Sequence, residues 1–141
     1  MYIKQISVFV ENTTGRLAEF TKVLKDNNID MKALCIADTT DFGILRCLVE
    51  KPEETAQILK ENGFTASITE VLAVEMKDIP GGLNSILEVL SAKGIGVDYV
   101  YSIIRSRENH AVIIIKVEDP GEAIDALTAA GIQLYCQKDL I

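Results

Sequence analysis

This sequence of 141 residues has no tryptophan, three prolines and a single histidine, His110. A hydrolytic site built on serine or cysteine needs a partner base, and one histidine in a polar turn does not supply it. The cysteines Cys35, Cys47 and Cys136 lack CxxC spacing, which argues against a disulfide framework or a zinc site and favours reduced thiols. A glycine-rich phosphate loop of the Walker type is also missing. We therefore expect no enzyme, no metal site and no cofactor.

Long apolar runs and excess positive charge are missing too. No apolar run approaches the roughly 20 residues of a membrane-spanning helix, and the start "MYIKQISVFVEN" does not resemble a cleavable targeting segment. The net charge of −7 has the wrong sign for binding phosphates or anionic lipid. With 48% apolar residues the chain is expected to fold. The sequence thus predicts a cytoplasmic protein that binds neither nucleic acid nor membrane.

The second half of the chain repeats the first. A shift of 66 positions pairs glycines and apolar residues: Gly15 with Gly81, Leu17 with Leu83, Val23 with Val89, Leu24 with Leu90 and Ile29 with Ile95. Further along, a shift of 68 pairs corresponding residues: Val49 with Val117, Pro52 with Pro120, Leu59 with Leu127 and Gly63 with Gly131. These pairs keep the same order along both copies, which indicates a duplication.

Periodicity predicts the elements of the first copy. Alternating residues at 3–10 indicate a strand, and an apolar stripe at helical spacing indicates a helix whose stripe faces a sheet: Leu17, Phe20, Val23 and Leu24. Two strands joined by a polar turn are expected at 29–37 and 44–50. A second helix is expected from Pro52 to Gly63, and a last strand at 64–76.

The second copy carries the same signals. Pro80 is expected to open its first helix and Gly94 to end it, with strands at 95–104 and 110–117. The second of these strands is apolar on both faces, so it is expected in the middle of its sheet. Asp119 is a good N-cap for the next helix, which Gly131 terminates, and a closing strand is expected at 132–141.

Both copies therefore read strand, helix, strand, strand, helix, strand. That order predicts an α+β protein of two ferredoxin-like βαββαβ modules, each an antiparallel sheet with its helices on one face. We place the modules at 1–70 and 71–141. The last strand of the first copy and the first strand of the second are both expected to include residues 69–73. This overlap predicts either one long strand or an exchange of strands.

Two loops resemble a known family. "ENTTGRL" (11–17) and "DIPGGL" (78–83) resemble the loop of ACT domains, small amino-acid-binding regulatory modules, in which Asn or Asp is followed by any residue, Pro, Gly, any residue and Leu. The second loop fits fully, whereas the first has Thr14 where proline is usual. The resemblance covers nearly the whole chain as two consecutive modules, and the first half is most similar to the serine-sensing tail of phosphoglycerate dehydrogenases.

The resemblance implies an amino-acid site at each loop, and the chemistry agrees. The first turn of a helix offers unpaired amides and positive dipole to a carboxylate, and Gly15 and Gly81 let the ligand approach. Asn12 or Asp78 stands at the strand end to accept from the ammonium. The expected ligand-binding residues of the loops are Asn12, Thr13, Thr14, Gly15, Arg16, Leu17, Asp78, Ile79, Gly81, Gly82 and Leu83.

In ACT domains the ligand usually lies between two modules and also touches the start of the second strand. Carried over, this implies contacts from Asp30 and Met31 in the first copy and from Gly96 and Val97 in the second. Gly96 lacks a side chain where Asp30 has one, so the two sites need not bind equally. The same loop residues are also ordinary capping and turn residues, and a structural role remains the alternative.

The sequence thus predicts a regulatory sensor of a free amino acid, made of two ACT modules. Its output would pass through a regulated partner protein or through a change of oligomer, such as a homodimer. One alternative is a ligand-free interaction module that assembles through its sheet faces. A weaker one is a small acyl- or phosphoryl-transfer enzyme, suggested by Arg16 beside Asn12 but lacking an anion cradle.

Overall fold

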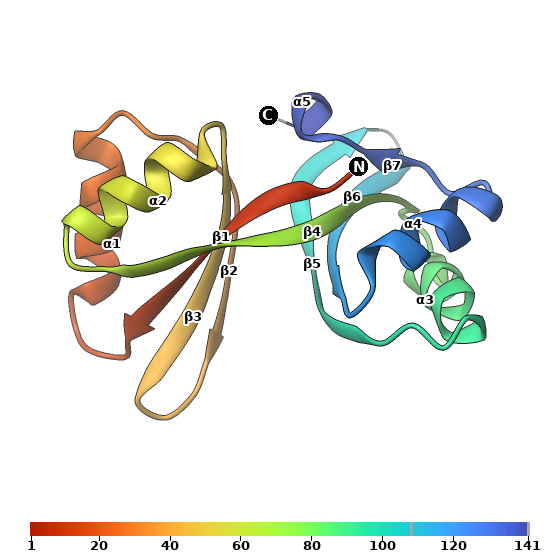
Figure 1. Cartoon of the computed structure of the whole chain (residues 1–141), viewed down its shortest axis with the longest axis horizontal. Helices are drawn as coiled ribbons and strands as arrows, with labels where there is room; N and C mark the ends of the chain where they lie inside the picture. Colours follow the sequence, from red (N-terminus) through yellow and green to blue (C-terminus); the bar gives the residue numbers. More distant parts are fainter. Residues whose placement is uncertain (108, 141) are drawn as a thin grey trace. The chain divides into compact units, whose positions relative to one another are not determined.

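The chain forms two compact units. The computed structural model describes residues 1–107 and 109–140, and of the stretch 104–107 it describes the backbone alone. One unit, called here the first module, comprises Lys4–Thr69, and the other, the second module, comprises Met1–Ile3 and Glu70–Leu140. Each module is described below by itself (Figure 1).

The first module is an antiparallel sheet covered by two helices. Its elements are β1 (Ile3–Glu11), α1 (Arg16–Asp26), β2 (Met31–Asp38), β3 (Phe42–Val49), α2 (Pro52–Glu61) and the beginning of β4 (Thr65–Lys77). The strand order is β2-β3-β1-β4, and β3 pairs antiparallel with both of its neighbours. Helices α1 and α2 lie side by side on one face of these strands (Figure 1). This is the architecture that the sequence predicts.

The core of the first module lies between the sheet and its helices. Alternate strand residues and inward helix residues form one buried cluster that includes Ile6, Val8, Leu45, Phe20, Leu24 and Leu59. The rings of Phe20 and Phe64 meet edge to face at 5.8 Å. The predicted stripe is wrong at Leu17, which is 41% exposed.

The second module repeats this plan. After the end of β4 follow α3 (Gly82–Ala92), β5 (Val97–Arg107), β6 (His110–Val117), α4 (Pro120–Ala129), β7 (Leu134–Tyr135) and α5 (Gln137–Leu140). Strand β6 pairs with β4 on one side and β5 on the other, which confirms its predicted central place. Strand β7 pairs with the other edge of β4. Helices α3 and α4 pack together over a second buried cluster.

Two predicted element ends of the second module are wrong. Helix α3 begins at Gly82 and not at Pro80, because Gly81 adopts a left-handed conformation (φ 86°) that turns the chain just before the helix. The expected closing strand shrinks to the two residues of β7, because the Asp139 carboxylate accepts from the Cys136 amide (3.1 Å) and α5 follows there. The N-cap prediction is confirmed, since Asp119 accepts from the Glu122 amide (3.0 Å).

Strand β4 is one continuous strand of 13 residues, the first of the two arrangements expected at 69–73. Its residues up to Thr69 belong to the first module and those from Glu70 onward to the second. Within residues 1–107 and 109–140, no helix has the length and apolar character needed to cross a membrane. The side chains described there also include no cluster of three or more His, Cys, Asp or Glu suited to a metal ion.

Candidate functional site

The loop between β4 and α3 is a tight corner that only glycine permits. Gly81 is left-handed, and the Gly82 amide donates to the Ile79 carbonyl at 3.0 Å. A Cβ atom added to Gly82 would lie 2.0 Å from the Lys77 carbonyl oxygen, far inside any real contact. The Ser85 amide and hydroxyl both donate to the Gly81 carbonyl at 3.0 Å. The main chain at the start of α3 is thus fixed, with Gly81 exposed and Gly82 buried.

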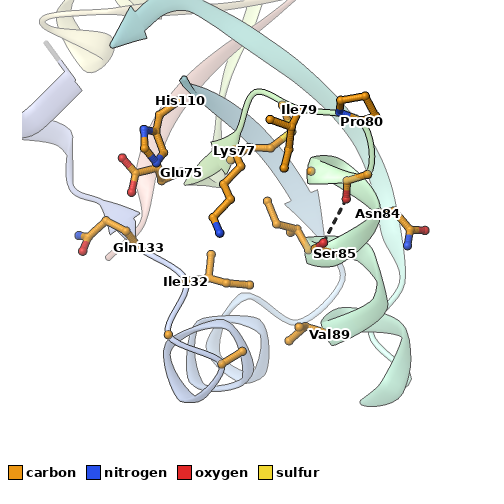
Figure 2. Close-up of a pocket in the computed structure, with 16 residues that line it drawn as sticks. Glu75, Lys77, Ile79, Pro80, Asn84, Ser85, Val89, His110, Ile132 and Gln133 are labelled. Carbon is orange, nitrogen blue, oxygen red and sulfur yellow. Dashed lines mark hydrogen bonds between the residues drawn. The ribbon is translucent and has the colours of Figure 1, made fainter. Parts of the chain in front are cut away.

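A pocket of about 680 Å³ opens beside this corner. Its walls come from the end of β4, the loop, the first turns of α3, the start of β6 and the segment Ala130–Gln133 after α4. Figure 2 shows the Lys77 side chain reaching into the pocket toward Ile132, with Glu75 and His110 along one side. All of these residues belong to the second module.

The pocket combines one cation, one carboxylate and an apolar floor. The exposed Lys77 ammonium has no hydrogen bond or ion pair with any residue that the structure describes. Glu75 is half-buried, and its Oε1 accepts from the Tyr135 hydroxyl at 2.8 Å. The floor is apolar, with Ile86 buried and Val89 and Ile132 half-buried. A few polar groups above apolar side chains are typical of small-molecule sites.

The other predicted residues of this loop differ in their exposure. Asp78 is exposed, and its amide donates to the Asn109 carbonyl at 2.9 Å. Ile79 is 58% exposed and lines the pocket. Leu83 is half-buried against the core of the module and does not line the pocket.

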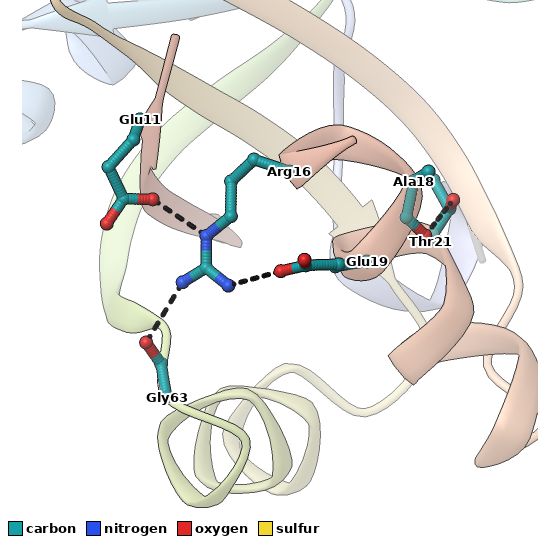
Figure 3. Close-up of polar contacts among 6 residues, drawn as sticks. All are labelled: Glu11, Arg16, Ala18, Glu19, Thr21 and Gly63. Carbon is teal, nitrogen blue, oxygen red and sulfur yellow. Dashed lines mark hydrogen bonds and ion pairs between the residues drawn. The ribbon is translucent and has the colours of Figure 1, made fainter. Parts of the chain in front are cut away.

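The corresponding corner of the first module is occupied by Arg16 (Figure 3). Its Nε donates to Glu11 Oε2 at 2.7 Å, one terminal nitrogen to Glu19 Oε2 at 2.8 Å, and the other to the Gly63 carbonyl at 3.1 Å. The guanidinium carbon lies 3.9 Å from the centre of the Phe64 ring. All donating nitrogens of the guanidinium are therefore used inside the module, and only 20% of the side chain is exposed.

The charges of this cluster stabilise one another. Hydrogen bonds to Glu19 and then Glu11 raise the pKa of Arg16, so it is charged at every accessible pH. A backbone hydrogen bond and then the Arg16 guanidinium lower the pKa of Glu11 below its ordinary value. The cluster joins the end of β1, the first turn of α1 and the end of α2.

The rest of the first loop is polar and exposed. The Asn12 amide group leans toward the β2–β3 turn, where its Nδ2 donates to the Thr40 carbonyl at 3.4 Å. The Thr13 amide donates to the Glu11 carbonyl at 2.9 Å, while Thr14 is exposed. Gly15 is left-handed (φ 87°), as Gly81 is in the second module.

The predicted residues at the second strands lie at the other end of each sheet. Met31 opens β2 and is paired with Val49, whereas the loop end of β1 is paired with Phe42. Strand β2 has eight residues, so its ends are separated by about 23 Å, seven steps of about 3.3 Å. Asp30 is exposed and pairs with Lys32 at 2.7 Å, while Met31 packs against the core.

The second module repeats this separation. Val97 opens β5 opposite Val117, far from the pair Lys77–His110 beside the loop, and Val97 packs against the core. Gly96 is exposed next to Glu118. Within one module, therefore, the loop residues lie together and the second-strand residues lie apart from them.

Several pocket residues were not anticipated from the sequence: Glu75, Lys77, His110, Ile132 and Gln133. Lys77 directly precedes the loop motif, which was a usable signal. His110 and Ile132 lie 33 and 55 positions beyond Lys77 in the sequence, so no local pattern links them to the loop. The tertiary structure brings them together.

Comparison with known proteins supports this description. A family model described as an ACT domain pair matches residues 1–141. The crystal structure of protein BT0572 from Bacteroides thetaiotaomicron is similar over 99% of this chain and 96% of that chain, with 39% identity and a TM-score of 0.92. The ligand-free regulatory subunit of aspartate kinase from Thermus thermophilus shares the fold over 90% and 91% of the two chains, with 16% identity and a TM-score of 0.65. No curated protein sequence matches the chain.

Proposed function

This chain belongs to the family of ACT domain pairs, and from that premise we propose that it is a non-catalytic regulatory protein that binds a free amino acid beside the start of α3. The observation that carries the proposal is the pocket of about 680 Å³ bordered by Gly81 and Gly82. One of the solved structures with this fold is the regulatory subunit of aspartate kinase. An ACT domain pair fits such a regulatory role.

The pocket offers a partner for each part of an amino acid. The start of α3 presents main-chain amides and the positive end of the helix dipole to the carboxylate. The carboxylate of Glu75 accepts from the ammonium, and the side chain of the ligand covers the apolar floor. A zwitterion is thus matched in both charges, whereas a purely apolar molecule leaves them unused.

Regulation follows if the ligand favours one arrangement of the protein over another. The output then passes to a regulated partner protein or to a second copy of this chain. We also propose the reducing cytoplasm as its location, because Cys35, Cys47 and Cys136 are free thiols. Burial raises the pKa of Cys47 to about 12, so this thiol is held in its unreactive form.

The test is a thermal melt of the protein with each of the twenty amino acids. A ligand present at 100 times its dissociation constant adds about 2.7 kcal/mol of stability, which raises the melting temperature measurably. Val89→Phe fills the pocket and is expected to remove the response. Leu87→Phe is the matched control, since Leu87 is also half-buried on α3 but does not line the pocket. A flat panel with wild-type protein would contradict the proposal.

A ligand-free interaction module is the second candidate. Large apolar side chains are exposed on the strands of the first module, with Phe9 at 41%, Leu34 at 45% and Ile36 at 43%. Such a surface suits assembly with another protein. A flat amino-acid panel together with a concentration-dependent oligomer in light scattering would favour this candidate. The transfer-enzyme alternative gains no support, because the Arg16 guanidinium on which it depends is engaged within its own module.

A further inference from the structure

The two corners of this protein differ at equivalent positions. The shift of 66 that relates the first helices places Glu11 opposite Lys77, Arg16 opposite Gly82 and Glu19 opposite Ser85. The shift of 68 that relates the second helices places Gly63 opposite Gly131 and Phe64 opposite Ile132. The five residues of the Arg16 cluster therefore correspond to Lys77, Gly82, Ser85, Gly131 and Ile132, and all five line the pocket of the second module.

The pocket is thus lined by the counterparts of the residues that the Arg16 side chain contacts in the first module. There the Arg16 guanidinium lies over Phe64 and between two carboxylates, and Phe64 beneath it is only 4% exposed. In the second module the equivalent residue is Gly82, whose surroundings leave no room for even a Cβ atom. Ile132, in the place of Phe64, is half-buried and faces the pocket.

The charged groups at the two corners differ. In the first module two carboxylates surround a cation, and the charges are satisfied from within the chain. In the second module Lys77 replaces one carboxylate and Ser85 the other, while the Glu75 carboxylate, which also lines the pocket, accepts from the Tyr135 hydroxyl. Lys77 is without a polar partner among the described residues. An occupant that pairs with Lys77 carries an acid group, and the apolar floor suits an aliphatic body attached to it.

We propose that the second-module pocket binds an aliphatic carboxylate, its acid group paired with Lys77 and its carbon chain on Val89 and Ile132, while Arg16 closes the first corner. One chain then binds one such molecule. The inference deepens the proposed function, because an aliphatic amino acid contains this carboxylate. It differs from the proposed function because a carboxylate and a carbon chain are enough for binding. An ammonium group on the ligand adds only a contact with Glu75.

Three probes with one carbon skeleton test the ligand class. They are L-leucine, isocaproate (leucine without its ammonium) and isoamylamine (leucine without its carboxylate), each titrated into isotope-labelled full-length protein while backbone amide NMR signals are followed. Leucine and isocaproate are expected to shift the signals of Gly81–Ile86 and Gly131–Gln133, and isoamylamine is not. Signals of Glu11–Glu19 are expected to stay unchanged with all three.

Lys77→Met tests the proposed anchor, since methionine keeps the length of the chain without its charge. Lys77 is exposed, so the variant is expected to fold and to bind isocaproate about fivefold more weakly, as for a solvent-accessible ion pair. Lys93→Met, at the far end of α3, is the charge-matched control and is expected to bind as wild type does. Equal affinity in Lys77→Met and wild type would overturn the assignment of the anchor.

Arg16→Gly tests the closed corner. It leaves Glu11 and Glu19 around an empty space, so ethylguanidinium is expected to raise the melting temperature of the variant and to shift the signals of Glu11–Glu19. Wild-type protein is expected to respond to ethylguanidinium no more than to sodium at equal ionic strength. If leucine or isocaproate shifts the first-corner signals of wild type, the corner is open and the inference is wrong.

The outcomes separate this inference from the proposed function. If isocaproate binds the pocket but no amino acid raises the melting temperature, the amino-acid proposal fails and the carboxylate site stands. If an amino acid binds and neither isocaproate nor Lys77→Met behaves as expected, the carboxylate inference fails and the amino-acid proposal stands. If isoamylamine binds the pocket and isocaproate does not, the inferred charge of the ligand is wrong.

Discussion

At the scale of a residue, Arg16 determines the chemistry of the first corner. The sequence places it among the ligand-binding residues of the first loop, and the structure shows its guanidinium engaged with Glu11, Glu19, the Gly63 carbonyl and the Phe64 ring. Planar guanidinium chemistry suits this cluster, because the fork donates in several directions while its face stacks on an aromatic ring. The same position is a glycine in the second module.

Arg16→Met is expected to reduce the free energy of unfolding at pH 7 by roughly 1 to 2 kcal/mol, since it removes the Gly63 hydrogen bond and the stacking on Phe64. The two ion pairs are largely exposed at their carboxylates and add little. Urea unfolding measures the change. Lys22→Met is the control on the same helix, where the Lys22 side chain is 70% exposed, and it is expected to be nearly neutral.

The stability lost in Arg16→Met should become smaller as the pH falls. The folded pKa of Glu11 lies below its unfolded value, so the charged carboxylate stabilises the fold above the unfolded pKa, and this stability is lost as the pH falls through the folded pKa. Arg16 supplies part of that shift. The difference between wild type and Arg16→Met is therefore expected to be constant above about pH 5 and to shrink below about pH 4. A difference that grows on acidification would contradict the Glu11–Arg16 pairing.

At the scale of an element, the start of α3 contains two adjacent positions that require glycine, each for a different reason. Gly81 needs a left-handed backbone, which side chains disfavour. Gly82 is part of α3 and must be glycine for a different reason. The Lys77 carbonyl lies where a Cβ atom of any other residue would be. The pocket beside α3 therefore depends on the close approach of this helix start to the end of β4.

Gly82→Ala is expected to destabilise the protein by about 3 kcal/mol, because the helix start must move away from β4 to admit a methyl group. Gly96→Ala is the matched control. Its added Cβ would be 3.6 Å from Glu118, an ordinary contact, and its effect is expected to stay within about 0.5 kcal/mol. Urea unfolding compares the two variants, and equal stabilities would show that the close approach at Gly82 is absent in solution.

At the scale of the whole molecule, the module boundaries do not follow chain order. Met1–Ile3 belong with Glu70–Leu140, although the rest of β1 belongs with the first module. Ile3 is 1% exposed, so its side chain is part of a packed interior. Likewise, β4 gives residues to both modules. The second module therefore includes a segment, Met1–Ile3, that a cut at residue 70 would remove.

Ile3→Ala is expected to cost about 3 kcal/mol through lost burial and a residual cavity. The grouping of Ile3 with the second module predicts where the loss appears. Hydrogen exchange is expected to accelerate more in β6 (His110–Val117) than in β3 (Phe42–Val49). Tyr2→Ala, at a residue 44% exposed, is the control and should change neither strand. A larger effect in β3 would place Ile3 with the first module.

How much the sequence reveals is clear from particular elements. The alternation at 3–10, the apolar strand at 110–117 and the cap at Asp119 each predict an element that the structure contains. These signals are local, because period, capping and turn chemistry act within a few residues. Two local signals nevertheless mislead. Leu17 is exposed although it continues a stripe, and the expected closing strand ends after Tyr135.

The sequence by itself determined the duplication, the order of strands and helices, and the two glycine corners. Only the tertiary structure decided which corner is open. The Arg16 guanidinium contacts Gly63 and Phe64, which follow it by 47 and 48 positions in the sequence. The pocket of the other module is built from β4, α3, β6 and the segment after α4. The physical reason is that a pocket is space left by packing, and packing joins residues that no local pattern relates.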